Sequence, residues 1–203
     1  MDDFGHDGAC PPWTLSEYTV GVNCSEFLTS VERRLEEQLE RGKAVGKRLD
    51  VNGLNFKADP AKWSAGQIYE HMMLANAHYL PVMKAAIEGA PRVKVGDSVQ
   101  HTWFGKFIIK GAGPEGNAPA PKSLHPRGGS FDTTVVDKWA TQTQAFLDLA
   151  RRAHGVDLCA MKIKNPFIPF FKANLADCFE ILTEHTERHI RQIESLADKA
   201  VRV

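Results

Sequence analysis

The stretch LADCFEILTEHTERHIRQIESLADK, residues 175–199, decides how this sequence is interpreted. Its apolar residues return every three or four positions, as they do on one face of an α-helix. They form one stripe that we expect to be buried: Leu175, Phe179, Leu182, Ile193 and Leu196. The residues expected to point away from that stripe are charged: Glu180, Glu187, Arg191 and Glu194. The stretch therefore predicts a long amphipathic helix, beginning after the N-cap Asn174.

Three earlier segments show the same helical period. The first covers residues 25–50, with Ser25 as its N-cap. The second opens at residue 64, and we expect Pro81 to kink or end it because proline lacks the N–H that a helix interior needs. The third begins at Thr133 or Thr134. Four long amphipathic helices without a convincing sheet predict an all-α fold, a four-helix bundle.

A long connection separates the second and third of these helices. Residues 89–130 are rich in glycine and proline and show no helical period, and so long a connection is usually functional or disordered. It either lines a pocket or merely covers the core. Because it can cross the whole bundle, it lets the two helices run in the same direction, in an up-down-down-up order. Residues 1–24 are expected to form an irregular N-terminal extension to a single domain over 25–203.

Composition limits the possible partners and locations. With 203 residues, 43% of them hydrophobic, the chain can bury a core without disulfides. The 25 basic and 25 acidic residues cancel, which argues against nucleic acid and against an anionic membrane as partner. The four cysteines form no C-x-x-C pair, and the first residues carry acids where a signal peptide has basic residues. We therefore expect a cytoplasmic protein.

Two histidines on the last helix indicate a metal site. His185 and His189 are four residues apart, one helical turn, so both imidazoles could reach one ion. His189 lies inside the apolar stripe and His185 at its edge, and burying imidazoles is costly unless they have partners. A third ligand should come from another helix, and His71 lies on the apolar stripe of the second helix. His78, two turns further, is the fallback.

Other interpretations of the pair stay open. Histidines with this spacing are often ordinary surface or core residues with hydrogen bonds of their own. The zinc protease pattern H-E-x-x-H is not met, because Thr186 stands where the glutamate would be and Glu187 is expected to face solvent. Gln192 lies on the same edge as His185 and could orient a ligand, although a surface glutamine is more common.

The spaced residues Trp63-Ser64 and His71, followed by the pattern H-x-x-R-H-x-x-Q over 185–192, resemble the DinB/YfiT-like superfamily. The resemblance extends from about residue 25 to residue 196. It implies an up-down-down-up four-helix bundle, often dimeric, that holds one zinc, nickel or iron ion. Carried over by position, the metal ligands are His71, His185 and His189. Its members include enzymes that act on small molecules with low-molecular-weight thiols, so the resemblance implies small-molecule substrates, among them a low-molecular-weight thiol. Because members of the family are often dimeric, it also implies a homodimer.

Three functional hypotheses follow. In the first, the protein is a metal-dependent enzyme whose open coordination position activates a thiol or water for transfer to a small electrophile, as an S-transferase or hydrolase does. In the second, a non-catalytic, stress-associated bundle uses the ion to tie two helices together, with His78, Tyr79 or His101 as a fourth ligand. In the third, no metal is bound and the histidines are satisfied by the core.

Overall fold

The computed structural model describes residues 21–94, 97–168 and 170–200. The described chain is mostly helical, as predicted for an all-α protein. The elements in chain order are α1 (Cys24–Lys47), α2 (Val51–Asn55), α3 (Ala65–Gly89), α4 (Trp103–Ala112), a 3₁₀ turn η1 (Lys122–Leu124), α5 (Thr134–Arg152), β1 (Ile163–Lys164), β2 (Lys172–Ala173) and α6 (Leu175–Ala200). The strands form only a short antiparallel pair, with Ile163 opposite Ala173.

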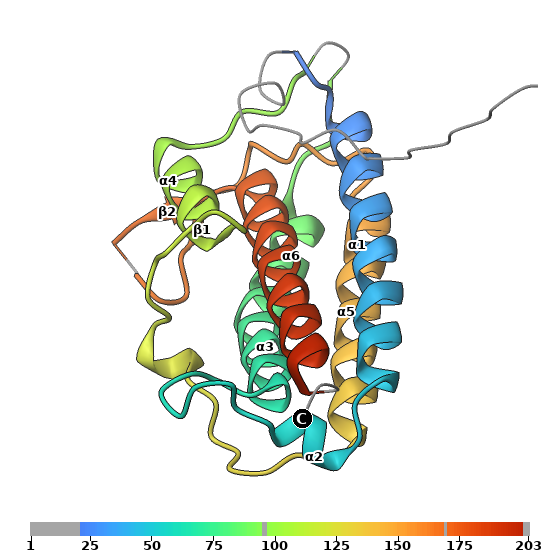
Figure 1. Ribbon diagram of the computed structural model, residues 1–203. Helices are drawn as coiled ribbons and strands as arrows, with labels where there is room; N and C mark the ends of the chain where they lie inside the picture. The colour runs from blue at the N-terminus through green and yellow to red at the C-terminus, as the bar shows by residue number, and fades with distance from the viewer. Residues whose placement is uncertain (1–20, 95–96, 169, 201–203) are drawn as a thin grey trace, which may run out of the picture.

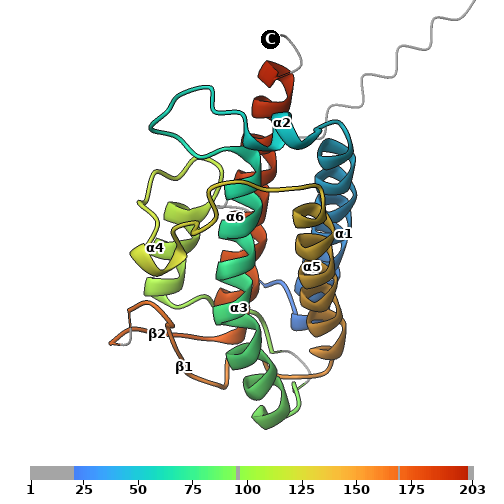
Figure 2. The same ribbon diagram turned by 90° about the horizontal axis from the view of Figure 1, so that it is seen from below.

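The four long helices lie side by side (Figure 1). Seen from below, α1 lies next to α5, and α3 lies next to α6 (Figure 2). Contacts also join α3 to α5 and α1 to α6, so each long helix packs against two others. Together the four helices enclose one interior. The short helix α4 packs outside this group, on α6.

Helix α1 begins earlier than the sequence predicted. Asn23, rather than Ser25, is the N-cap: its side-chain oxygen accepts the N–H of Glu26 at 2.9 Å, and the Glu26 carboxylate accepts the N–H of Asn23 at 3.3 Å. This reciprocal capping box starts the helix at Cys24, inside the predicted N-terminal extension. Residues 1–20 of that extension lie outside the described residues. The helix ends at Lys47, three residues before the predicted end.

Helix α3 continues through its proline. The predicted capping box is present, because Ser64 accepts the N–H of Gln67 at 3.3 Å and the Gln67 side chain accepts the N–H of Ser64 at 3.1 Å. Pro81 does not end the helix, which runs on to Gly89. Proline costs the helix one backbone hydrogen bond. The turns after Pro81 stay helical because their residues Met83 and Ile87 are buried in the core.

The sequence predicts no helix in the connection between α3 and α5, but the structure has one there, α4. Thr102 caps this helix, its hydroxyl accepting the N–H of Gly105 at 2.9 Å. The buried carboxylate of Asp177 in turn accepts the N–H and the hydroxyl of Thr102, at 3.1 and 2.7 Å. A Cβ on Gly105 would overlap this carboxylate, so glycine permits the close approach of α4 to α6. At ten residues, α4 is too short for its helical period to stand out in the sequence.

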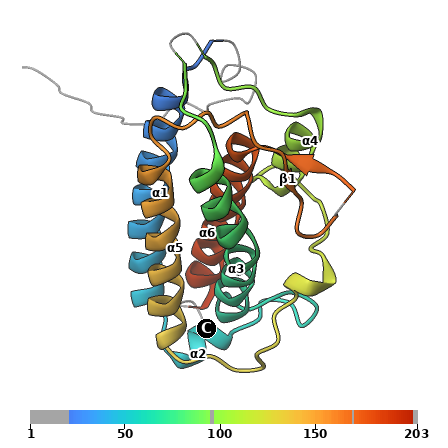
Figure 3. The ribbon, with the colours of Figure 1, turned by 180° about the vertical axis from the view of Figure 1, so that it is seen from behind.

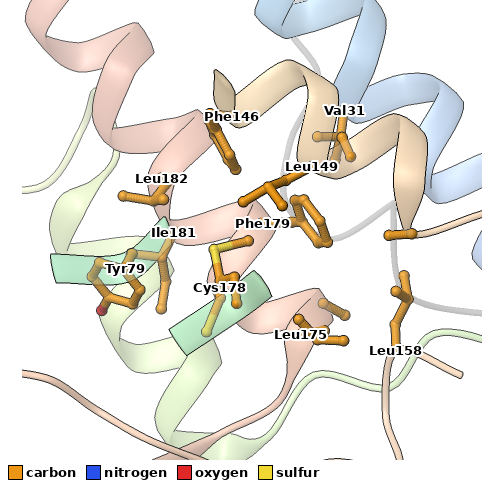
Figure 4. Close-up of a cluster of buried hydrophobic side chains, with 14 of the residues drawn as sticks. Val31, Tyr79, Phe146, Leu149, Leu158, Leu175, Cys178, Phe179, Ile181 and Leu182 are labelled. Carbon is orange, nitrogen blue, oxygen red and sulfur yellow. The ribbon is translucent and has the colours of Figure 1, made fainter. Parts of the chain in front are cut away.

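The core is built by the predicted apolar stripe of α6. Leu175, Phe179 and Leu182 meet Val31 of α1, with Tyr79, Phe146 and Leu149 completing this part of the interior (Figure 4). Ile193 is also fully buried, in a second cluster around Trp139, whereas Leu196 is only partly buried. The helix wheel therefore located the buried face correctly, apart from its last turn.

One prediction for the polar side of α6 is wrong. Glu180 and Glu187 do not face solvent but turn toward α1. The guanidinium of Arg34 lies 2.6 Å from the carboxylate of Glu180, and that of Arg41 lies 2.9 Å from Glu187 and 2.9 Å from Glu194. Glu180 is only 7% exposed. A helix wheel separates apolar from charged faces, but it does not show that a neighbouring helix supplies the opposite charges.

Candidate metal centre

The three predicted histidines converge between α3 and α6. His185 and His189 lie one turn apart on α6, and their Nε2 atoms are 3.1 Å apart. The Nε2 atom of His71, on α3, lies 2.9 Å from that of His185. One ligand atom of each histidine lies within 4.8 Å of the others, so the three could hold one metal ion. The fallback His78 lies elsewhere, exposed and packed against the ring of Phe167.

The outer nitrogens of two of these rings are held by hydrogen bonds. The Nδ1–H of His71 donates to the backbone carbonyl of Leu124 at 2.7 Å. The Nδ1–H of His189 donates to the side-chain oxygen of Gln192 at 2.8 Å. A neutral imidazole carries one proton, so both Nε2 atoms present lone pairs to the centre. The Nε2–H of His185 can donate to the Nε2 atom of His71 or to that of His189, but not to both. One of the three Nε2 atoms therefore has no hydrogen-bond donor within the cluster.

All three histidines resist protonation. His71 and His189 are 2% and 5% exposed, and His185 is half-buried. Removal from water lowers the pKa of each ring, that of His189 to about 3. The neighbouring histidines and the guanidinium of Arg188 lower the pKa values of His185 and His189 further. At neutral pH the rings are therefore neutral, the form that binds metal ions.

The connection between α3 and α5 forms part of the site. Besides the Leu124 carbonyl, it contributes the carbonyl of Gly111 at the end of α4, which accepts a hydrogen bond from Arg188 at 3.2 Å. The indole of Trp63, just before α3, lies 4.8 Å from the ring of His71. The sequence could not identify Leu124, because any residue type offers a backbone carbonyl. The connection thus contacts the histidine cluster through the Leu124 carbonyl.

A sequence model of the DinB superfamily matches residues 34–193. The chain belongs to the DinB superfamily. The match covers most of the chain and includes all three histidines, together with Trp63 and Gln192, on which the resemblance depended. No curated protein matches this DinB chain, and neither does any solved structure. Among its described helices none combines the length and the apolar character needed to cross a bilayer.

No fourth histidine, cysteine, aspartate or glutamate joins the three histidines of this DinB protein within the described ranges 21–94, 97–168 and 170–200. The candidates considered for a closed shell have other partners. His101 lies 3.0 Å from the carboxylate of Asp177, and the hydroxyl of Tyr79 accepts a hydrogen bond from Asn165 at 3.1 Å. The described donor set is therefore three imidazole nitrogens, and a divalent ion bound to them would keep at least one position for another ligand.

Proposed function

We propose that this protein is a metal-dependent enzyme, which holds one divalent ion with His71, His185 and His189 and activates a thiol or water for transfer to a small electrophile. The observation that supports this most directly is the convergence of three Nε2 atoms with no further histidine, cysteine or carboxylate beside them in the described part of the chain. Catalytic zinc sites typically combine three protein ligands with one exchangeable position, whereas structural sites are closed by four.

The donor set fits a divalent transition metal. Imidazole nitrogen suits zinc, nickel and iron alike, so the histidines do not select among these ions. The bonds from His71 to Leu124 and from His189 to Gln192 direct both lone pairs inward and keep the rings in place. An ion held there would lower the pKa of a bound thiol or water and so supply a nucleophile near neutral pH.

The residues around the histidines support binding of a small, anionic group. Arg188 places a positive charge near the three rings, and its hydrogen bond to Gly111 restrains it. The indole of Trp63 forms an apolar wall beside His71. We infer that Arg188 attracts a thiolate or carboxylate while Trp63 limits access of water. Low-molecular-weight thiols, which the family resemblance implies as substrates, carry both a thiol and a carboxylate.

The family also suggests the finer architecture. We infer that α1, α3, α5 and α6 follow the up-down-down-up order, since the long connection over residues 90–133 lets α3 and α5 run in the same direction. A homodimer and a cytoplasmic location are further proposals that rest on the resemblance and on composition.

Metal content is the first test of the proposed function. Elemental analysis of the purified protein should give close to one divalent ion per chain, and the His185→Ala variant should retain little. His78→Ala is the matched control, because this exposed histidine on α3 lies outside the cluster and its loss should leave the metal content unchanged. A metal content near zero in the wild-type protein, after growth with added zinc, nickel or iron, would contradict the proposal.

The open position needs a separate test. In cobalt-substituted protein, adding a low-molecular-weight thiol should produce thiolate-to-cobalt charge-transfer absorption, and a thioether of the same size should not. The zinc, nickel and iron forms should then be assayed for transfer of the thiol to small electrophiles and for ester hydrolysis. A full complement of metal, with no spectral response to thiol and no turnover, would favour the non-catalytic metal-binding alternative.

A further inference from the structure

A group of large apolar side chains is exposed on α4 and on the segment that joins β1 and β2. Of the five large hydrophobic residues exposed in the described chain, four are here: Trp103 (72%), Phe107 (68%), Ile168 (39%) and Phe170 (95%). We name these four the α4–hairpin patch. Figures 1 and 3 show α4 beside the β1–β2 hairpin, outside the long helices. Exposed apolar groups of this size generally mark an interaction surface.

Aromatic packing holds the two halves of the patch together. The ring of Phe171, from the hairpin, stacks on that of Phe104 of α4 with centroids 4.3 Å apart. It also meets the ring of Trp103 edge to face at 5.7 Å. Phe104 is buried, so α4 and the hairpin present their exposed side chains from one supported surface. The exposed side chains of the patch are therefore supported by the packing of α4 against the β1–β2 segment.

The two segments that carry the patch are basic. Residues 103–112 and 161–173 contain no aspartate or glutamate, although the whole chain has 25 acidic residues to balance 25 basic ones. They contain five exposed lysines: Lys106, Lys110, Lys162, Lys164 and Lys172. Overall neutrality argues against an anionic membrane as partner, but both segments that carry the exposed aromatic side chains are basic.

We propose that the α4–hairpin patch docks this protein on the surface of an anionic lipid bilayer. Tryptophan and phenylalanine side chains are accommodated at the boundary between headgroups and acyl chains, while lysines attract anionic headgroups. Phe170, at 95% exposure, projects from the surface, so it can enter a soft interface without a preformed pocket on the partner. This inference is independent of the proposed metal chemistry.

Two other partners fit the patch less well. Single-stranded nucleic acid binds through bases that stack on exposed aromatic rings, which makes no use of the aliphatic Ile168, whereas a bilayer interface accepts aliphatic and aromatic side chains alike. A second copy of the chain would have to bring the same five lysines toward the first copy, because a two-fold interface uses the same surface on both subunits. An anionic bilayer satisfies both the apolar and the charged parts of the patch.

Vesicle co-sedimentation with the full chain tests the proposal. The protein should bind vesicles of phosphatidylcholine containing about a third phosphatidylserine and should bind pure phosphatidylcholine much less. Raising the salt concentration should weaken binding, because the Debye length falls to about 3 Å at 1 M. Bromine-labelled acyl chains should quench part of the tryptophan fluorescence in the wild-type protein, and less of it in Trp103→Phe.

Matched variants separate the apolar and charged contributions. Lys164→Gln with Lys172→Gln should weaken binding by ~25-fold, taking about 1 kcal/mol for each lysine near the surface. Trp103→Ser with Phe170→Ser should weaken it by at least about tenfold. The controls are Val51→Ser, an apolar residue 49% exposed on α2, and Lys84→Gln with Lys138→Gln on α3 and α5. All the substituted side chains are exposed, so each variant should keep the wild-type circular dichroism spectrum.

Several results would overturn the proposal. One is failure of the wild-type protein to bind the anionic vesicles at low salt. Another is equal loss of binding in the patch variants and in their controls. Size-exclusion chromatography showing a dimer that Trp103→Ser with Phe170→Ser converts to a monomer, without vesicle binding, would assign the patch to self-association. Binding of an oligothymidylate that is lost in the patch variants, again without vesicle binding, would assign it to nucleic acid.

Discussion

Gln192 allows the proposed metal site to be tested without altering a ligand. Its side-chain oxygen accepts the Nδ1–H of His189 at 2.8 Å, while the residue itself lies at an exposed position. Replacing it by alanine removes the group that holds the ring in its metal-binding tautomer but leaves the core packing unchanged. Loss of such outer partners typically lowers metal affinity by 10–100-fold, or about 1.4–2.7 kcal/mol. We expect Gln192→Ala to lie in this range.

Gln192→Glu should change the affinity in the opposite direction. A carboxylate is a stronger acceptor than an amide, so it makes the imidazole of His189 a better electron donor, and its negative charge favours a bound cation. We therefore expect the order of affinity to be Glu, then Gln, then Ala at position 192. The free energy of unfolding of the metal-free protein should change by less than about 0.5 kcal/mol in Gln192→Ala, as is usual for exposed positions.

The assay is competition for zinc against a chromophoric chelator at pH 7. Ser195→Ala is the matched control, because Ser195 is exposed on the same helix, three residues further. Its affinity should equal that of the wild-type protein. If the alanine and glutamate variants at position 192 bind zinc as tightly as the wild-type protein, or if both bind more weakly, the orienting role of this hydrogen bond is refuted.

Three other perturbations have defined outcomes. The pKa of His189 is lowered from 6.5 to about 3 by burial, so between these values the unfolded chain binds more protons than the folded one. In urea unfolding of metal-free protein, His189 alone should lower the stability by about 1.4 kcal/mol per pH unit as the pH falls below 6.5, and His71 and His185, whose pKa values are also lowered, should add to this loss. Gly105→Ala should cost at least about 2 kcal/mol in thermal or urea unfolding, because its Cβ would overlap the Asp177 carboxylate. Arg34→Met should cost at least about 2 kcal/mol in the same assay, since it leaves the buried Glu180 without its cation.

Each of these predictions has a matched control. Removing the imidazole in His189→Gln should reduce the acid-dependent loss of stability, whereas His78→Gln, at an exposed position, should leave it unchanged. Gly129→Ala should have little effect, since no atom lies within 4 Å of the added Cβ. Arg33→Met, at a neighbouring exposed position on α1, should also be nearly neutral. Stability that is independent of pH, or equal effects in variant and control, would contradict the corresponding argument.

The sequence by itself determined the parts of this protein that depend on local chemistry. The capping box at Ser64 and the apolar stripe of α6 located two long helices, because caps and helical periodicity are properties of neighbouring residues. The spacing of His185 and His189 placed two imidazoles on one helical face, which the structure retains. The family pattern then indicated His71 as the third member of the group, and the structure brings it to the other two.

Only the tertiary structure decided the features that depend on distant neighbours. The Leu124 carbonyl has no sequence signature, yet it sets the tautomer of His71 across 53 positions of the chain. Glu180 looked like a surface residue until α1 brought Arg34 against it. Exposed aromatic side chains of α4 and of the β1–β2 segment come together only because these two elements pack against each other. These features arise from packing, because a side chain's environment is set by whichever helix folds against it and not by the residues beside it in the chain.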